Sequence, residues 1–139
     1  MKYTYEYPRA LNTVDIIIMA ANSKILLIKR LNEPFKNMWA LPGGFIEMDE
    51  KLINSAKREL EEETHLKNIE LKQFRTYGDP GRDPRGRNIS LVFYGTCYSP
   101  SDAKAGDDAY ETQWANIKTL PKMAFDHEKI IEDFKNFIG

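Results

Sequence analysis

Three glutamates stand at helical spacing near the middle of this chain of 139 residues. Glu59, Glu62 and Glu63 occupy positions i, i+3 and i+4, so a helix would place their carboxylates on one face. Like charges at this spacing repel each other. A hard divalent cation removes that cost, because Mg²⁺ takes carboxylate oxygens and keeps waters and substrate phosphates as its other ligands. The spacing therefore predicts a metal site on a helix.

The residues before the glutamates predict how this helix is positioned. Pro42 precedes two glycines, Gly43 and Gly44, which is a turn signal. Glycine lets the backbone approach closely, so the Gly43 carbonyl could add a neutral metal ligand. An apolar stripe at four-residue intervals then predicts the helix. Its members are Leu52, Ala56 and Leu60.

A basic residue also stands within the acidic run. Arg58 lies eight residues after Glu50, just over two helical turns, so the two side chains could pair along the helix. The residues alone leave a second interpretation open, in which the acidic run is a solvated helix face. The glycine turn, Glu50 and Arg58 together favour the metal site.

This spacing resembles the Nudix box, the signature of hydrolases that cleave a nucleoside diphosphate linked to another group. Five residues separate Gly44 from Glu50, and seven separate Glu50 from Arg58. The box then continues as Arg58-Glu59-Leu60-Glu61-Glu62-Glu63-Thr64-His65-Leu66. His65 departs from the family, which usually has the glycine that ends a helix in a left-handed conformation. Histidine tolerates that conformation better than most residues but less well than glycine, so this departure affects the geometry of the cap more than the metal site.

The resemblance implies roles for the residues of the box. Glu59, Glu62, Glu63 and the Gly43 carbonyl would hold Mg²⁺, with Mn²⁺ as a possible substitute, and the ion would generate a nucleophile from water at neutral pH. Arg58 would orient a glutamate by pairing with it. The proton would pass to Glu59 or to a carboxylate in residues 107–111. That acidic segment contains Asp107, Asp108 and Glu111, and a solvated loop is the alternative interpretation.

A second group of basic residues lies in a segment rich in proline and glycine, residues 78–87. It carries Arg82, Arg85 and Arg87 among aspartates. A planar guanidinium matches phosphate oxygens, so these arginines could clamp a phosphate or a ribose. A surface turn with compensating charges is the alternative. Arg30, at the end of a predicted strand, could likewise reach a phosphate or lie in solvent.

This loop resembles the compact ADP-ribose pyrophosphatase branch of the Nudix family, in which an Arg-Asp-Pro-Arg-Gly loop lies beside the active site. Asp15 after Thr13-Val14 and the sequence Phe125-Asp126-His127 share the resemblance. It implies hydrolysis of ADP-ribose to AMP and ribose 5-phosphate. Three other substrates remain open: an oxidised nucleoside triphosphate, a dinucleotide polyphosphate and NADH. His127 could serve chemistry, substrate binding, helix capping or packing.

The apolar pattern predicts one domain over residues 1–139. We expect strands over residues 13–20, 24–30, 69–77 and 88–98, with another opening at Trp114. An amphipathic helix is expected over residues 125–138, with Asp126 as its N-cap. Strands around two helices predict an α/β/α sandwich with a mixed central sheet, which is also the fold that the resemblance implies. Trp39 and the only cysteine, Cys97, are expected in the core.

Composition bounds the partners. The net charge is −1, so no overall field attracts DNA, RNA or a membrane. The first ten residues lack the apolar core of a signal peptide, and we expect a cytoplasmic protein. Alternating Tyr3, Tyr5 and Tyr7 predict an edge strand, an arm that forms a homodimer, or a frayed terminus.

A sensor is the rival class. Some repressors of NAD metabolism carry a similar Nudix domain that binds ADP-ribose, followed by a DNA-binding winged helix. Since this sequence ends at Gly139, we expect the enzyme instead.

Overall fold

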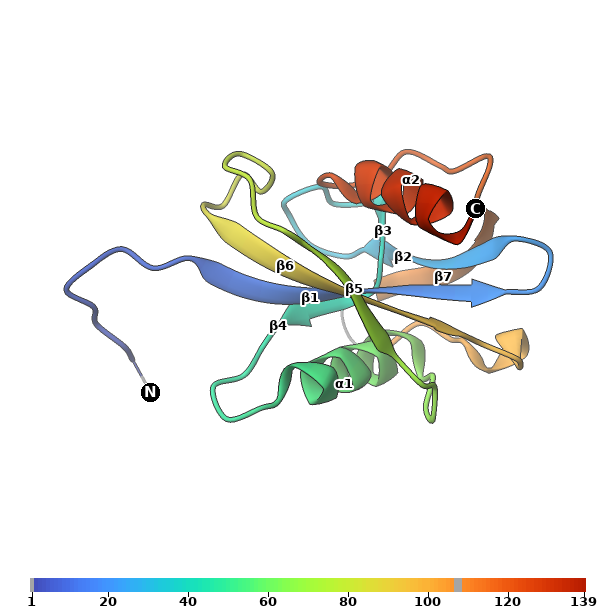
Figure 1. The fold of residues 1–139 in the computed structure, drawn as a ribbon, viewed down its shortest axis with the longest axis horizontal. Coiled ribbons are helices and arrows are strands. Elements are labelled where there is room, and N and C mark those ends of the chain that lie inside the picture. The colour runs from blue at the N-terminus through green and yellow to red at the C-terminus, as the bar shows by residue number, and fades with distance from the viewer. Residues whose placement is uncertain (1, 107–108) are drawn as a thin grey trace.

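Two helices cover opposite faces of one mixed β-sheet in the computed structural model, which describes residues 2–106 and 109–139 (Figure 1). Helix α1 (Leu52–Thr64) lies below the sheet in Figure 1 and α2 (His127–Ile138) lies above it. The strands are β1 (Leu11–Ala20), β2 (Lys24–Arg30), β3 (Trp39–Ala40), β4 (Gly43–Phe45), β5 (Lys72–Tyr77), β6 (Asn88–Thr96) and β7 (Ala109–Asn116). The predicted α/β/α sandwich with a mixed sheet is confirmed.

The pairing of β1 and β2 shapes the site. The two strands pair only beside their turn, through Met19 with Ile25 and Ala20 with Lys24. Farther from the turn, β4 pairs with β1 and β3 pairs with β2, while β7 pairs with β2 from Lys24 onward. On its other edge β1 runs parallel to β6 along its length, and β5 follows β6. The short strand β4, which carries the two glycines, is therefore fixed against β1.

The alternation of side chains along β1 supplies both layers of the core. Val14, Ile16 and Ile18 pack toward α1 with Ala56 and Leu60. Ile17 packs on the other face, toward the apolar residues of α2. Successive side chains of a strand point to opposite faces, so Asp15 faces α2 as Ile17 does. This places a carboxylate beside the first turn of α2.

Several boundaries differ from the sequence prediction. The strand expected from residue 69 begins at Lys72, and the strand expected to reach residue 98 ends at Thr96. The last helix begins at His127 rather than at Phe125, whose φ of 52° is left-handed. Glu50 precedes α1, so its pairing with Arg58 reaches back across the start of the helix.

The cap of α1, the two predicted core residues and the N-terminal segment have these conformations. His65 ends α1 with φ of 63°, the left-handed conformation, and its amide donates to the Glu61 carbonyl. Cys97 is buried, and Trp39 packs against the core on the α2 side. Residues 2–10 contain neither helix nor strand and extend away from the sandwich (Figure 1). Within the described part of the chain, no helix has the length and apolar character needed to cross a membrane.

Candidate functional site

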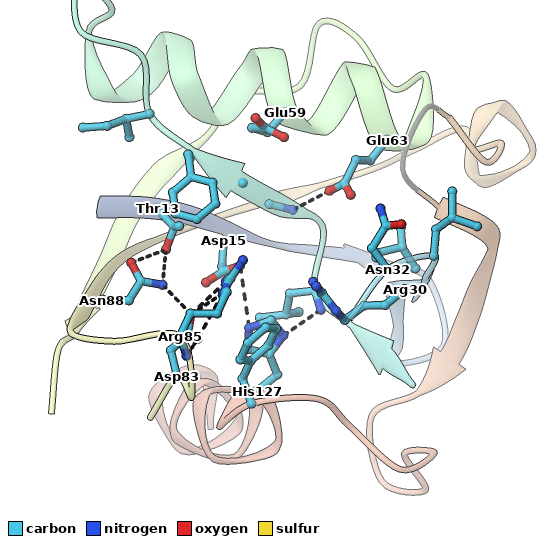
Figure 2. Close-up of a pocket in the computed structure, with 18 of the residues that line it drawn as sticks. Thr13, Asp15, Arg30, Asn32, Glu59, Glu63, Asp83, Arg85, Asn88 and His127 are labelled. Atoms are coloured by element: carbon cyan, nitrogen blue, oxygen red, sulfur yellow. Dashed lines mark hydrogen bonds and ion pairs between the residues drawn. The ribbon is translucent and has the colours of Figure 1, made fainter. Parts of the chain in front are cut away.

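One pocket of about 490 Å³ collects most of the predicted site residues (Figure 2). Its walls come from β1, β2, β4, the start of α2, α1 and the arginine-rich loop between β5 and β6. The charged residues and histidine that line it are Asp15, Arg30, Glu33, Glu47, Arg58, Glu59, Glu63, Arg82, Asp83, Arg85 and His127. Segments distant in sequence thus meet around one cavity.

The first wall is formed by α1 and the glycines of β4. The buried Glu63 carboxylate accepts a hydrogen bond of 2.7 Å from the Gly43 amide. A Cβ on Gly43 would lie 2.2 Å from the Val14 carbonyl oxygen. A Cβ on Gly44 would lie 2.4 Å from a carboxylate oxygen of Glu59. Gly43 is therefore required for the close approach of β4 to β1, whereas a side chain at Gly44 would displace the Glu59 carboxylate.

Arg58 organises the acidic groups on this wall. Its Nε donates to Glu50 at 2.7 Å, and its Nη1 donates to Glu59 at 2.7 Å and to Glu62 at 3.3 Å. Its Nη2 also donates to the Phe45 carbonyl at 3.0 Å. These hydrogen bonds, that to Glu50 first, raise the pKa of Arg58 above its ordinary value. The predicted pairing of Glu50 with Arg58 is confirmed.

The oxygen donors of this wall fit a hard divalent cation by chemistry. Glu59 and Glu63 both line the pocket beside the Gly43 backbone. Glu62 is not among the lining residues, and its side chain is 45% exposed beside Arg58. Among the described residues, no three acidic, histidine or cysteine side chains are grouped closely enough to hold a metal ion.

The opposite wall is centred on a buried carboxylate, Asp83. Arg85 donates to both oxygens of Asp83, with 2.8 Å from Nη2 to Oδ2, and Asn88 donates to Oδ2 at 3.1 Å. Asn88 in turn contacts Thr13 of β1 (Figure 2). Burial alone would raise the pKa of Asp83, but the hydrogen bonds from Arg85 and Asn88 hold it below its ordinary value. An ionised Asp83 thus fixes the loop to the sheet.

The three arginines of the loop have different environments. Arg82 makes a two-point ion pair with Asp126, at 2.9 and 2.7 Å, and only 5% of its side chain is exposed. Arg85 lines the pocket and is 36% exposed. Arg87 donates to the Gly78 carbonyl on the exposed side of the loop and is not among the pocket residues. Asp126, predicted as an N-cap, makes no side-chain capping bond and instead pairs with Arg82.

Aromatic rings surround the cationic part of the pocket. The Arg85 guanidinium lies 5.2 Å from the ring centre of Phe45 and 5.5 Å from that of Phe125. Arg30 lies 4.9 Å from the Phe125 ring and donates to the Pro34 carbonyl. Burial, followed by the charge of Arg85, lowers the pKa of Arg30. Arg30 thus faces the pocket, and an anion there would relieve the repulsion between the two guanidinium groups.

A buried polar group lies at the base of the pocket. His127 accepts a hydrogen bond of 3.0 Å at Nδ1 from the Leu41 amide, and its Nε2 lies 3.7 Å from Asp15 Oδ1. Ser90 donates to the other oxygen of Asp15. Burial lowers the pKa of His127 despite the nearby carboxylates. His127 therefore has its Nδ1 unprotonated and its ring neutral.

Of the three predicted distal carboxylates, the structure describes only Glu111. Asp107 and Asp108 fall outside the described residues. Glu111 lies on β7, where its carboxylate is 3.6 Å from Lys29 and is mostly exposed, and it is not a pocket residue. The loop before β7 still reaches α1, because the Gly106 amide donates to the Glu63 carbonyl at 2.8 Å.

Sequence reasoning missed two residues that line the pocket and a third, Ser90, that holds the pocket residue Asp15. It did not single out Phe45, Asn88 or Ser90, whose partners are distant along the chain. The only local signal was Asn88 itself, a polar residue where a strand begins after a loop rich in glycine.

Comparison with known proteins identifies relatives of this arrangement. The family model for the NUDIX domain matches residues 10–134. An ADP-ribose pyrophosphatase of Methanocaldococcus jannaschii is 48% identical over 117 residues, which cover 84% of this chain and 69% of that protein.

Two further relatives are a transcriptional repressor and a NUDIX domain bound to ADP ribose. The ADPR responsive transcriptional repressor NtrR of Acinetobacter baylyi is 33% identical over 91% of this chain, and the match spans 54% of the repressor. The crystal structure of the NUDIX domain of Shewanella oneidensis NrtR in complex with ADP ribose superposes with a TM-score of 0.88 at 28% identity. That superposition covers 96% of this chain and 91% of the NrtR chain.

Proposed function

This chain belongs to the NUDIX domain family, and from that premise we propose that it is a pyrophosphohydrolase that cleaves ADP-ribose into AMP and ribose 5-phosphate with a divalent metal ion. The observation that carries the proposal is one pocket with two chemically different walls. Glu59 and Glu63 line the wall at α1, and Arg30 and Arg85 line the other (Figure 2). Such a pocket suits a substrate with a pyrophosphate between two organic groups.

The wall at α1 is proposed to hold the ion. Glu59, Glu62, Glu63 and the Gly43 carbonyl are the ligands, and Mg²⁺ is the first ion to test, followed by Mn²⁺. When bound, such an ion supplies charge neutralisation at the pyrophosphate and lowers the pKa of water. Arg58 keeps the carboxylates oriented, because it holds Glu59 and Glu62 by direct hydrogen bonds.

The arginine wall is proposed to hold the substrate. Arg30 and Arg85 present guanidinium groups to phosphate oxygens, and the Phe45 and Phe125 rings limit where those groups can move. Arg82 acts through Asp126 by holding the loop in place. Arg87 remains a proposed contact to the outer end of the substrate.

The reaction itself transfers one phosphoryl group to water. A water oxygen bonds to one phosphorus, the bond from that phosphorus to the bridging oxygen breaks, and the bridging oxygen leaves with the other phosphate. A carboxylate takes the proton released by the water. Glu59 is the proposed acceptor because it lines the pocket, while Asp107 and Asp108 are the alternatives from the sequence.

Product analysis over a substrate panel tests this proposal. The purified protein is incubated with Mg²⁺ and, in separate reactions, with ADP-ribose, an oxidised nucleoside triphosphate, a dinucleotide polyphosphate and NADH, and products are separated by chromatography. Preferential formation of AMP and ribose 5-phosphate is the expected result. Preferential turnover of another compound would keep the hydrolase and overturn the substrate.

A sensor of ADP-ribose is the second candidate, favoured by the similarity to NtrR and to the NrtR domain. It uses the same pocket but does not need efficient hydrolysis. If calorimetry detects binding of ADP-ribose and no product forms with any divalent ion tested, the sensor is supported. The enzyme predicts turnover that depends on the ion, and it predicts no specific binding of DNA or RNA.

The remaining proposals concern the whole molecule. We propose a cytoplasmic homodimer with an arm formed by residues 2–10. The exposed side chains of Tyr3, Tyr5 and Tyr7 support the arm, because exposed aromatic rings are common in interfaces. Deleting residues 1–9 and measuring the mass in solution tests it. If the deletion variant has the same number of subunits in solution as the full chain, the arm does not form the dimer.

A further inference from the structure

The chain between β3 and β4 is held at successive backbone groups. The Trp39 carbonyl accepts a bond of 2.7 Å from the Ala124 amide, and the Pro42 carbonyl accepts one of 2.8 Å from the Ile16 amide. The Gly43 amide donates to Glu63. These three attachments are made by backbone groups and by Glu63, a proposed metal ligand. The fourth, at the Leu41 amide, uses the side chain of His127.

The His127 ring is suited to this attachment by its position and its surroundings. It is the first residue of α2, and it is 3% exposed. An amide must have an acceptor when it is buried, because an unpaired buried donor is costly. The lone pair of Nδ1 meets the Leu41 amide only if the ring proton is on Nε2, which faces Asp15. Ser90 in turn fixes Asp15 from β6.

We propose that His127 is a positioning residue whose Nδ1 holds the Leu41 amide and so sets the distance between Gly43 and Glu63. This inference rests on the proposed function, because Gly43 and Glu63 belong to the proposed metal site. Only Pro42, whose ring restricts the backbone, lies between Leu41 and Gly43 along the chain. The proposal therefore predicts that loss of the anchor at Leu41 loosens the backbone at Gly43, although pairing with β1 still holds that residue.

Two substitutions separate the two ring nitrogens. His127→Asn places an amide oxygen near the former Nδ1, whereas His127→Gln places it near the former Nε2. The asparagine and glutamine side chains are both polar and somewhat smaller than histidine, so the two substitutions should disturb packing to a similar extent. Glu128→Gln, at an exposed position next to His127, is the matched control.

Amide hydrogen exchange in the protein without metal and without substrate is the first readout. His127→Gln is expected to speed exchange at Leu41 and Gly43 by about 10-fold, since one net hydrogen bond is lost. His127→Asn and Glu128→Gln should stay within about 3-fold of the parent chain. Equal protection in the Asn and Gln variants, or protection retained only by Gln, would overturn the proposal.

Kinetics and ion binding provide the second readout. His127→Gln should lower kcat by about 10-fold while KM for ADP-ribose changes by less than about 3-fold, because a positioning residue acts through the backbone rather than by binding substrate. Mn²⁺ binding, measured by calorimetry without substrate, should weaken in the same variant and recover in His127→Asn. A rise in KM with unchanged kcat would show a direct contact with substrate and would contradict positioning. The exchange and Mn²⁺ measurements remain decisive if ADP-ribose is not the substrate.

Discussion

The two walls of the pocket hold their charged groups in different ways. On the α1 wall, Arg58 and Glu50 are eight residues apart, and Glu63 and Gly43 are twenty apart. On the opposite wall, Arg82 and Asp126 are 44 residues apart, and Thr13 and Asn88 are 75 apart. The first wall is thus mostly built by one helix and the turn before it. The second joins a local cluster around Asp83 to strand β1 and helix α2, which are distant in the sequence.

This difference determines which charged side chains remain available to bind a ligand in the pocket. On the α1 wall a single guanidinium, Arg58, is shared among several carboxylates, so those groups are close enough to exchange partners. On the other wall Arg82 and Arg85 both pair with an aspartate and both line the cavity, but the Arg82 side chain is 5% exposed and that of Arg85 is 36% exposed. Two arginines of one loop therefore differ in accessibility: Arg82 stabilises the loop, whereas Arg85 is accessible from the pocket.

The largest expected effect comes from removing a charge on the α1 wall. Glu63→Gln should lower kcat by at least about 100-fold, because an amide is a poor ligand for a divalent ion. The amide oxygen can still accept the Gly43 hydrogen bond, so the far-UV circular dichroism should not change. Glu61→Gln, at an exposed position on the same helix, is the control and should keep near-parental turnover. Parental kcat in Glu63→Gln would make the metal assignment wrong.

The dedicated pair on the opposite wall should affect stability. Arg82→Ala is expected to lower the free energy of unfolding by about 2 kcal/mol, since it leaves a partly buried Asp126 without its partner. Arg87→Ala, in the same loop, should change it by less than about 0.5 kcal/mol because Arg87 is exposed. Urea unfolding monitored by fluorescence measures both. Similar losses in the two variants would remove the distinction between these arginines.

An arginine that faces the pocket should affect substrate binding more than folding. Arg85→Lys keeps the charge but loses the planar fork, so KM for ADP-ribose should rise by about 10-fold. Asp83 keeps the hydrogen bond from Asn88 and the one from the Arg85 backbone amide, which limits the loss of stability. Steady-state kinetics measure the effect. An unchanged KM together with a large drop in stability would place Arg85 with Arg82 as a residue that holds the loop.

The smallest effect is a dependence of stability on pH at the α1 wall. Hydrogen bonds from Arg58 and then Ser55 lower the pKa of Glu50 from 4.5 to about 2. The stabilisation by Glu50 is therefore complete above pH 4.5 and is lost as the pH falls through about 2. The stability difference between the parent chain and Glu50→Gln should shrink over that range.

Urea unfolding at several pH values tests this sign. Glu47→Gln is the control, because its carboxylate lies 3.8 Å from Arg58 and is 67% exposed, so the pair contributes little at any pH. A difference for Glu50→Gln that stays constant from neutral pH down to pH 2 would contradict the assignment.

The sequence could predict the α1 wall because the residues that form this wall lie close together along the chain. Helical periodicity places Glu59 and Glu63 near one another, and the two glycines mark the turn that meets them. It could not show that Glu62 lies beside Arg58 outside the pocket, since the orientation of the helix is set by packing of Ala56 and Leu60. The helix was predictable, and its rotation about the pocket was not.

The opposite wall depends on the sheet. Composition indicated that the arginine loop could bind phosphate, but only the register of β1 with β6 brings Asn88 near Thr13 and Ser90 near Asp15. The role of Asp126 was also hidden, because the sequence favoured a capping role and the partner Arg82 is far away along the chain. The order of strands, which single-sequence patterns do not specify, decides this half of the site.

The most direct measurement follows ADP-ribose turnover as Mg²⁺ is titrated into metal-free protein, with AMP and ribose 5-phosphate quantified by chromatography and a chelator added at the end. We predict negligible product without the ion, product formation that saturates with Mg²⁺, and its arrest by the chelator. Equal turnover with and without divalent ions would contradict a metal site on the α1 wall. Tight ADP-ribose binding without product at any ion concentration would instead identify a sensor.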